Sequence, residues 1–170
     1  MQGHDLRALQ APLKATYRED AAAALLTLRA DGELGGGESV SCSVETGRAL
    51  VEAGLHPYSG GDGSLACSGD MLLQALVACA GVTLRAVAVN LGLAVGGRVL
   101  AEGDLDFRGT MAVDRDAPVG FREIRLSFEL ETDASDEELE TLLKLTERYC
   151  VVYQTLAAGV PVSLSHGVSR

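Results

Sequence analysis

The sequence has few basic residues. It carries 14 Lys and Arg against 24 Asp and Glu in 170 residues, for a formal net charge of −10. A nucleic-acid surface needs clustered Lys and Arg to neutralise phosphates, and an anionic membrane surface attracts the same side chains. We therefore expect no nucleic-acid partner and no membrane partner.

Several functional motifs are also lacking. The N-terminus contains His4, Asp5 and Arg7 and has no apolar core of a secretory signal, which predicts a cytoplasmic protein. No Gly-x-x-x-x-Gly-Lys-Ser/Thr phosphate loop is present. The remaining histidines, His56 and His166, are far apart and form no metal-ligand pair, so neither a zinc enzyme nor a hydrolase triad is indicated. We expect no cofactor and no metal.

Cysteines are few and widely spaced. The chain has Cys42, Cys67, Cys79 and Cys150, too sparse for a disulfide scaffold and without a Cys-x-x-Cys pair. In a reducing cytoplasm such thiols are either small buried hydrophobic residues or carriers of redox chemistry. The composition alone leaves both interpretations open.

The overall organisation suggests one domain. The length is typical of a single domain, 47% of the residues are hydrophobic, and no internal repeat appears. We predict one domain over residues 1–170, with about 12 residues at the N-terminus forming a flexible end. Alternation between Glu38 and Glu45 predicts a strand that turns Cys42 towards the core, whereas Ala21–Ala30 fits a strand or a short helix.

Two helices are predicted. The first runs from about Ser68 to Leu91, with Asp70 in its first turn and Cys79 on one of its apolar faces. Its length is enough for a membrane span, but Arg85 is unfavourable inside a bilayer. The second begins at Ser135, which forms a capping box with Glu138, and continues to Gly159 and Pro161 with Cys150 in the middle of its inward face.

Alternating segments predict a β-hairpin between these helices. The first runs from Val99 to Met111 and the second from Ile124 to Glu131, joined by a turn-rich connection. The tail, Val162–Val168, is predicted to add a last strand. The sequence therefore predicts an α+β fold in which helices cover one side of an antiparallel sheet.

The two helix cysteines are the candidate site that remains. Cys79 has the small neighbours Ala75, Thr83 and Ala86 on its face, which leave room beside the sulfur for a ligand or another helix. Cys150 lies on the other long helix, whose apolar face must meet the same core. A disulfide requires their Cα atoms to come within about 7 Å, which spacing in the sequence does not establish.

A motif in these helices resembles a known family. Gly60-Gly61, then the run from Ser68 to Cys79, and later Glu147-Arg148-Tyr149-Cys150 are similar to the two-cysteine pattern of OsmC/Ohr proteins. The resemblance extends from about Glu38 to Val168. It implies an intertwined homodimer with two sites at the subunit interface, each with a peroxidatic Cys, a resolving Cys, an Arg and a carboxylate.

The resemblance assigns a role to individual residues. Cys79 matches the peroxidatic position and Cys150 the resolving one, while Asp70 stands where the family usually has Glu. Arg48 follows Glu45-Thr46-Gly47 in an arrangement similar to the Ohr version and is the candidate Arg. Val151 stands where the family has Pro.

The implied function is reduction of organic hydroperoxides. A Cys79 thiolate, its pKa lowered by a guanidinium, would be oxidised to a sulfenic acid, and Cys150 would condense with it. An external dithiol, in the family a lipoylated protein or a small dithiol, would reduce the resulting disulfide. Two alternatives stay open: a dimeric stress-related or small-molecule-binding protein on the same fold, or two inert core cysteines.

Overall fold

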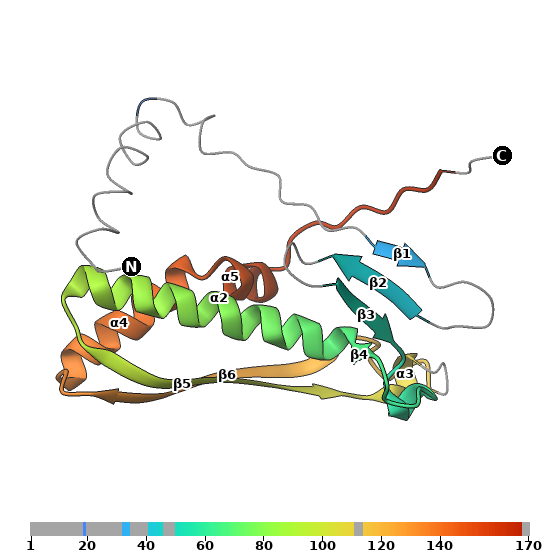
Figure 1. The fold of residues 1–170 in the computed structure, drawn as a ribbon, viewed down its shortest axis with the longest axis horizontal. Helices are drawn as coiled ribbons and strands as arrows, with labels where there is room; N and C mark the ends of the chain where they lie inside the picture. Colours follow the sequence, from blue (N-terminus) through green and yellow to red (C-terminus); the bar gives the residue numbers. More distant parts are fainter. Residues whose placement is uncertain (1–18, 20–31, 35–40, 46–49, 111–113, 168–170) are drawn as a thin grey trace. The chain divides into compact units, whose positions relative to one another are not determined.

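The structure, a computed structural model, describes residues 19, 32–34, 41–45, 50–110 and 114–167 (Figure 1). They belong to two compact units, Met1–Gln74 with Ala101–Leu126 and Ala75–Leu100 with Ser127–Arg170. The predictions for the N-terminal end, for Ala21–Ala30 and for Arg48 fall outside the described residues. One domain over residues 1–170 stays a prediction.

A small sheet dominates the first unit. Strands β1 (Gly32–Leu34), β2 (Ser41–Glu45) and β3 (Leu50–Gly54) pair antiparallel in that order. Strand β4 (Ala66–Cys67) adds to β3 in parallel. The strand predicted at Glu38–Glu45 is confirmed for its second half, β2. Cys42 pairs there with Ala53, but its side chain lies outside what the structure describes.

The loop between β3 and β4 turns tightly. It contains a 3-10 helix, η2 (Pro57–Ser59), followed by Gly60 with a φ of 95°. A Cβ at Gly61 would overlap the backbone carbonyl of Leu55, so only glycine fits there. This turn returns the chain to β4, and a long helix begins directly after it at Ser68.

The predicted hairpin is confirmed as β5 (Val95–Leu105) and β6 (Phe121–Thr132), which form a two-stranded sheet. Contacts of Thr132 with Ala94 and of Arg98 with Glu129 give an antiparallel register. Strand β5 begins earlier than predicted. Glycines at 96 and 97 interrupt the alternation there, and Gly97 adopts a φ of 111°.

The prediction that the first strand continues to Met111 was wrong. Strand β5 ends at Leu105, and the short helix α3 (Phe107–Thr110) follows. The Asp106 carboxylate accepts the backbone amide of Arg108 at 3.1 Å, a local bond that turns the chain. Phe107 stacks on the His56 ring, with 5.1 Å between centroids, instead of continuing the alternation.

The first long helix, α2 (Ser68–Leu91), is confirmed with Asp70 in its first turn. Its fully buried residues form one narrow stripe at every fourth position: Leu76, Ala80, Leu84 and Ala88. The other faces of α2 are partly or fully exposed in the single chain, and Cys79 lies half-buried beside this stripe. Among the described helices, α2 alone has the length and apolarity to cross a membrane, a property it shares with core helices of soluble proteins.

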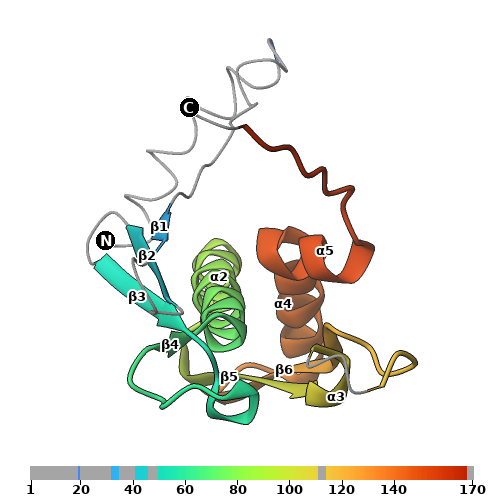
Figure 2. The same cartoon turned by 90° about the vertical axis from the view of Figure 1, so that its right-hand side faces the viewer.

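The core of the second unit joins helices to the hairpin. Leu84 and Ala88 of α2 pack with Val95 of β5 and Leu142 of α4 (Asp136–Tyr149). Figure 2 shows α2 and α4 side by side on the same face of β5 and β6. The capping box of Ser135 and Glu138 is present as predicted. These elements confirm the α+β fold class.

Two predictions for the C-terminal region were wrong. The second helix is not continuous: it stops at Tyr149, and a separate helix, α5 (Val151–Ala158), follows Cys150. The tail forms no strand over its described residues, which extend to Gly167 and are all exposed. Neither sheet of the described chain includes a residue of the tail.

Candidate functional site

The site begins with a break in the helical backbone. Cys150 is extended, with φ −74° and ψ 107°, and serves both as the last cap of α4 and as the first cap of α5. Its amide donates to the Thr146 carbonyl at 3.0 Å, and its carbonyl accepts the Gln154 amide at 2.9 Å. The Gln154 side chain donates to the Glu147 carbonyl at 2.9 Å. The break is therefore satisfied on both sides, and Cys150 is a junction residue instead of a mid-helix one.

This junction places the two predicted cysteines close together. The Cys150 side chain is 1% exposed, and each of the two thiols acts on the pKa of the other. Both cysteines are unlinked. Both belong to the second unit, with Cys79 on α2 and Cys150 between α4 and α5. The geometry therefore brings together the pair that spacing in the sequence left undecided.

The surroundings shift the pKa values of the two thiols in opposite directions. Burial raises the pKa of Cys79, but the hydrogen bonds that its sulfur accepts outweigh burial and lower the pKa below the ordinary value. These bonds come from the Val152 amide, the Cys150 thiol, the Thr83 hydroxyl and the Val151 amide. Burial raises the pKa of Cys150, and the neighbouring Cys79 raises it further. Cys79 is therefore the more acidic thiol of the pair and Cys150 the less acidic one.

The structure does not join the predicted carboxylate, Asp70, to this pair. Asp70 lies exposed in the first turn of α2 and forms no ion pair among the described residues. Arg48 lies outside the described residues. Of the four residues predicted for the site, the structure brings together Cys79 and Cys150. The interactions predicted for Asp70 and Arg48 stay predictions.

Sequence reasoning missed the donors around Cys79. The Val151 and Val152 amides are free to face the sulfur because a new helix begins at Val151, and the break at Cys150 has no glycine or proline to signal it. Thr83 was placed on the Cys79 face, but as a small neighbour and not as a hydrogen-bond donor. The four-residue spacing of Cys79 and Thr83 on one helix was the available signal that the two side chains are neighbours.

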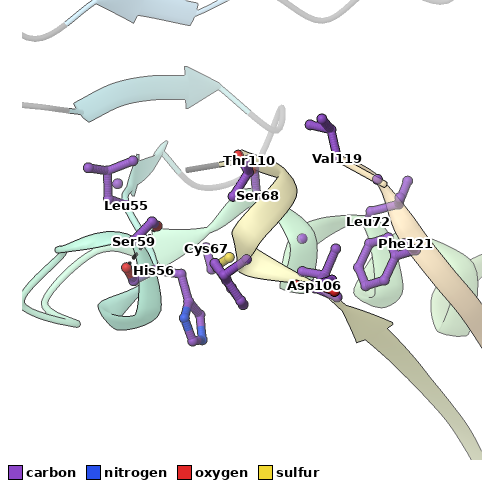
Figure 3. Close-up of a pocket in the computed structure, with 15 residues that line it drawn as sticks. Leu55, His56, Ser59, Cys67, Ser68, Leu72, Asp106, Thr110, Val119 and Phe121 are labelled. Carbon is purple, nitrogen blue, oxygen red and sulfur yellow. Dashed lines mark hydrogen bonds between the residues drawn. The ribbon is translucent and has the colours of Figure 1, made fainter. Parts of the chain in front are cut away.

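A separate cavity of about 360 Å³ lies within the first unit (Figure 3). Its wall is mainly apolar, with Leu72, Leu105 and Phe121 among the lining residues. Cys67 and His56 also line it, and the His56 Nδ1 accepts the Tyr58 amide at 3.1 Å. His56 is therefore a half-buried capping residue at the start of η2. Within the described part of the chain, no cluster of three or more His, Cys, Asp or Glu could hold a metal ion.

Comparisons with known proteins agree with this architecture. Residues 61–165 match the family described as OsmC-like protein. The structure is similar to that of an OsmC-like protein from Mycoplasma pneumoniae, with a TM-score of 0.65 and 18% identity over 79% of this chain and 89% of that one. No curated protein sequence matches the chain.

Two further solved structures have names that mention hydroperoxides. The organic hydroperoxide resistance protein OhrB of Bacillus subtilis aligns with a TM-score of 0.51 and 15% identity, over 79% of this chain and 93% of that one. An organic hydroperoxide resistance protein OsmC from Legionella pneumophila aligns with a TM-score of 0.55 and 18% identity, over 78% and 90% of the two chains. At such identities the likeness shows the fold. Together with the match over residues 61–165, it establishes that the chain belongs to the OsmC/Ohr family.

Proposed function

We propose that this protein is a thiol-dependent peroxidase that reduces organic hydroperoxides, with Cys79 as the nucleophile and Cys150 as the resolving thiol. One observation carries the proposal: the two thiols lie close enough for each to act on the pKa of the other, and their surroundings lower the pKa of Cys79 and raise that of Cys150. A pair of inert core cysteines requires no such difference.

The proposed chemistry follows from this difference in pKa. The Cys79 thiolate attacks the peroxide O–O bond; the sulfur takes one oxygen as a sulfenic acid, and the leaving alkoxide takes a proton to become an alcohol. The Cys150 thiol then attacks the oxidised sulfur, a disulfide forms, and water leaves. An external dithiol returns both cysteines to thiols and is itself oxidised to a disulfide.

Apolar surroundings favour an alkyl hydroperoxide over hydrogen peroxide. Ala75 and Ala86 flank Cys79 on α2, and Val151 and Val152 lie against its sulfur from α5. Burying an alkyl tail against such groups contributes about 25 cal/mol per Å² of apolar area, a gain that hydrogen peroxide cannot make. The substrate class we propose is therefore an organic hydroperoxide.

We propose that the functional form is a homodimer in the cytoplasm. Exposed apolar side chains support association: Val151 is 69% exposed, Val162 is 91% exposed and Leu164 is 100% exposed in the single chain. In such a dimer, Asp70 and Arg48 are the candidate carboxylate and guanidinium of the site. The reductant we propose is a dithiol, either small or carried on a lipoylated protein.

Hydroperoxide consumption with dithiothreitol as the dithiol tests this function. Cumene hydroperoxide is supplied to the wild type and to Cys79→Ser, Cys150→Ser and Cys67→Ser. We expect continued turnover in the wild type and in Cys67→Ser, no turnover in Cys79→Ser, and a single rapid turnover in Cys150→Ser. Continued turnover in Cys79→Ser, or none in the wild type, would contradict the proposal.

A second candidate function is binding of a small molecule without redox turnover. The cavity of the first unit supports it, because 360 Å³ lined by mainly apolar side chains is within the usual size of small-ligand sites. This candidate predicts that the wild type loses no titratable thiols when one equivalent of cumene hydroperoxide is added. The peroxidase proposal predicts the loss of two.

A further inference from the structure

The cavity of the first unit has two chemically different ends (Figure 3). Leu72 of α2, Val119 and Phe121 of β6 line one end. His56, from the loop between β3 and β4, lines the other, and the Cys67 sulfur lies between the two ends in this view. Every lining residue belongs to the first unit, so this unit forms the cavity by itself.

Two glycines make room for the Phe121 ring at the apolar end. A Cβ at Gly103 of β5 would overlap this ring. A Cβ at Gly69 of α2 would lie 3.5 Å from the ring, 3.6 Å from the Cys67 sulfur and 3.7 Å from a methyl carbon of Leu105. Ring, sulfur and methyl group therefore meet beside Gly69. Such a wall suits an apolar ligand, and above all an aromatic one, which can pack edge or face against Phe121.

The other end offers hydrogen-bonding groups. The His56 Nδ1 accepts the Tyr58 amide at 3.1 Å, so the neutral imidazole carries its proton on Nε2, which is a donor. The ring is held by Phe107, with 5.1 Å between centroids. The Ser59 hydroxyl donates to the His56 carbonyl at 3.0 Å, and its oxygen can still accept. A hydroxyl or carbonyl oxygen of a ligand can therefore be bonded at this end.

The charges at the cavity disfavour an ionised ligand. Among the described residues that line it, none is Lys or Arg. The lining carboxylate, Asp106, accepts the Arg108 guanidinium at 2.6 Å, and this bond lowers the pKa of Asp106 to about 2. The carboxylate is thus ionised at neutral pH and repels an anion. Its charge is already paired by Arg108, so it offers a cation little in return.

We propose that this cavity binds an uncharged small molecule with an apolar, aromatic body and one hydroxyl or carbonyl oxygen. The body packs against Leu72 and Phe121, and the oxygen bonds at His56. This inference rests on the binding function proposed above as the second candidate and names its ligand class. It involves neither Cys79 nor Cys150, so it holds with or without redox turnover.

Cys67 reports on the occupancy of the cavity, because its thiol lines the wall. The measurement is the rate of iodoacetamide alkylation at Cys67 in the full-length protein, resolved by peptide mass spectrometry, with glutathione in the same tube as a free-thiol reference. Three probes share one apolar body and differ in the head: 4-phenylbutan-1-ol, 4-phenylbutanoate and 4-phenylbutylammonium. We expect the alcohol to slow alkylation by the factor 1 + [L]/Kd, about sixfold at five times Kd. The two ions should protect Cys67 less at the same concentration.

Leu72→Asn and Leu91→Asn form a matched pair of variants. Both leucines belong to α2 and are similarly exposed, 37% and 40%, but Leu72 lines the cavity and Leu91 does not. We expect Leu72→Asn to weaken protection by the alcohol about three- to tenfold, because an apolar contact with the ligand is replaced by a polar one. Leu91→Asn should leave protection unchanged. If Leu72→Asn does not fold, Val119→Asn decides, since Val119 lines the cavity and is 66% exposed.

The outcomes separate the ligand class from the binding function. If no probe protects Cys67, or if Leu91→Asn loses as much protection as Leu72→Asn, both the inference and binding in this cavity are refuted. If either ion protects better than the alcohol, binding in the cavity stands and the ligand class proposed here is wrong. The assay contains no peroxide, so its result is independent of turnover at Cys79.

Discussion

Leu142→Ala should strongly destabilise the second unit. Leu142 is 0% exposed and packs against Leu84, Ala88 and Val95. Its carbonyl also accepts the Thr146 hydroxyl at 2.7 Å, one turn before Cys150. The substitution removes three buried carbons, which at about 0.8 kcal/mol each costs about 2.4 kcal/mol. A residual cavity of about 50 Å³ adds about 1.2 kcal/mol at 24 cal/mol per Å³.

We therefore expect the free energy of unfolding to fall by about 3–4 kcal/mol. The assay is urea unfolding followed by far-UV circular dichroism at one fixed protein concentration, because any dimerisation would couple to unfolding. Leu143→Ala is the matched control: it lies on the same helix but is 38% exposed, and it should lose less. A loss below about 1 kcal/mol for Leu142→Ala would refute this packing, because removing a fully buried leucine side chain costs more than that.

Three further predictions concern other parts of the fold. Gly97→Ala should destabilise the hairpin by about 2 kcal/mol or more, because φ is 111° and a Cβ would overlap the Glu129 carbonyl. Gly96→Ala is the control, since a Cβ there meets ordinary contacts. Equal urea midpoints for the two variants would contradict the register. Ser135→Ala removes the capping box of α4 and should cost about 1 kcal/mol in the same assay, while an unchanged midpoint would count against the cap. Because the pKa of Cys79 is lowered by folding, its thiolate stabilises the fold above the unfolded pKa, and this contribution is lost as pH falls through the folded pKa. The stability difference between wild type and Cys79→Ala should therefore shrink as pH falls below about 9, and a difference that grows would reverse the assignment.

Local sequence signals predicted most of the regular elements. The Ser135 and Glu138 pair marked the start of α4, and the apolar run from Ser68 marked α2 to its last residue. These signals succeed because capping and amphipathic packing act within a few residues. Where the chain departs from its pattern, as at Phe107, a local hydrogen bond from the Arg108 amide to Asp106 turns the chain, and Phe107 then contacts the ring of the distant His56.

The sequence indicated Cys79 and Cys150 as candidate site residues but did not predict the backbone geometry around Cys150. Resemblance to a family indicated Cys79 and Cys150, yet helical periodicity carried α4 straight through Cys150 and hid the junction. The donors to Cys79 include the backbone amides of Val151 and Val152, which every non-proline residue possesses. No pattern of side chains could have identified them. Their role can be inferred only once the structure shows that a new helix begins at Val151.

Peptide mapping of the oxidised protein tests the central claim most directly. The wild type is treated with one equivalent of cumene hydroperoxide, free thiols are blocked, and the digest is analysed by mass spectrometry without reduction. We predict one dominant linked peptide that joins Cys79 to Cys150, with Cys42 and Cys67 recovered as blocked thiols. Oxidation carried by Cys42 or Cys67, or Cys79 and Cys150 both recovered as blocked thiols, would contradict the account.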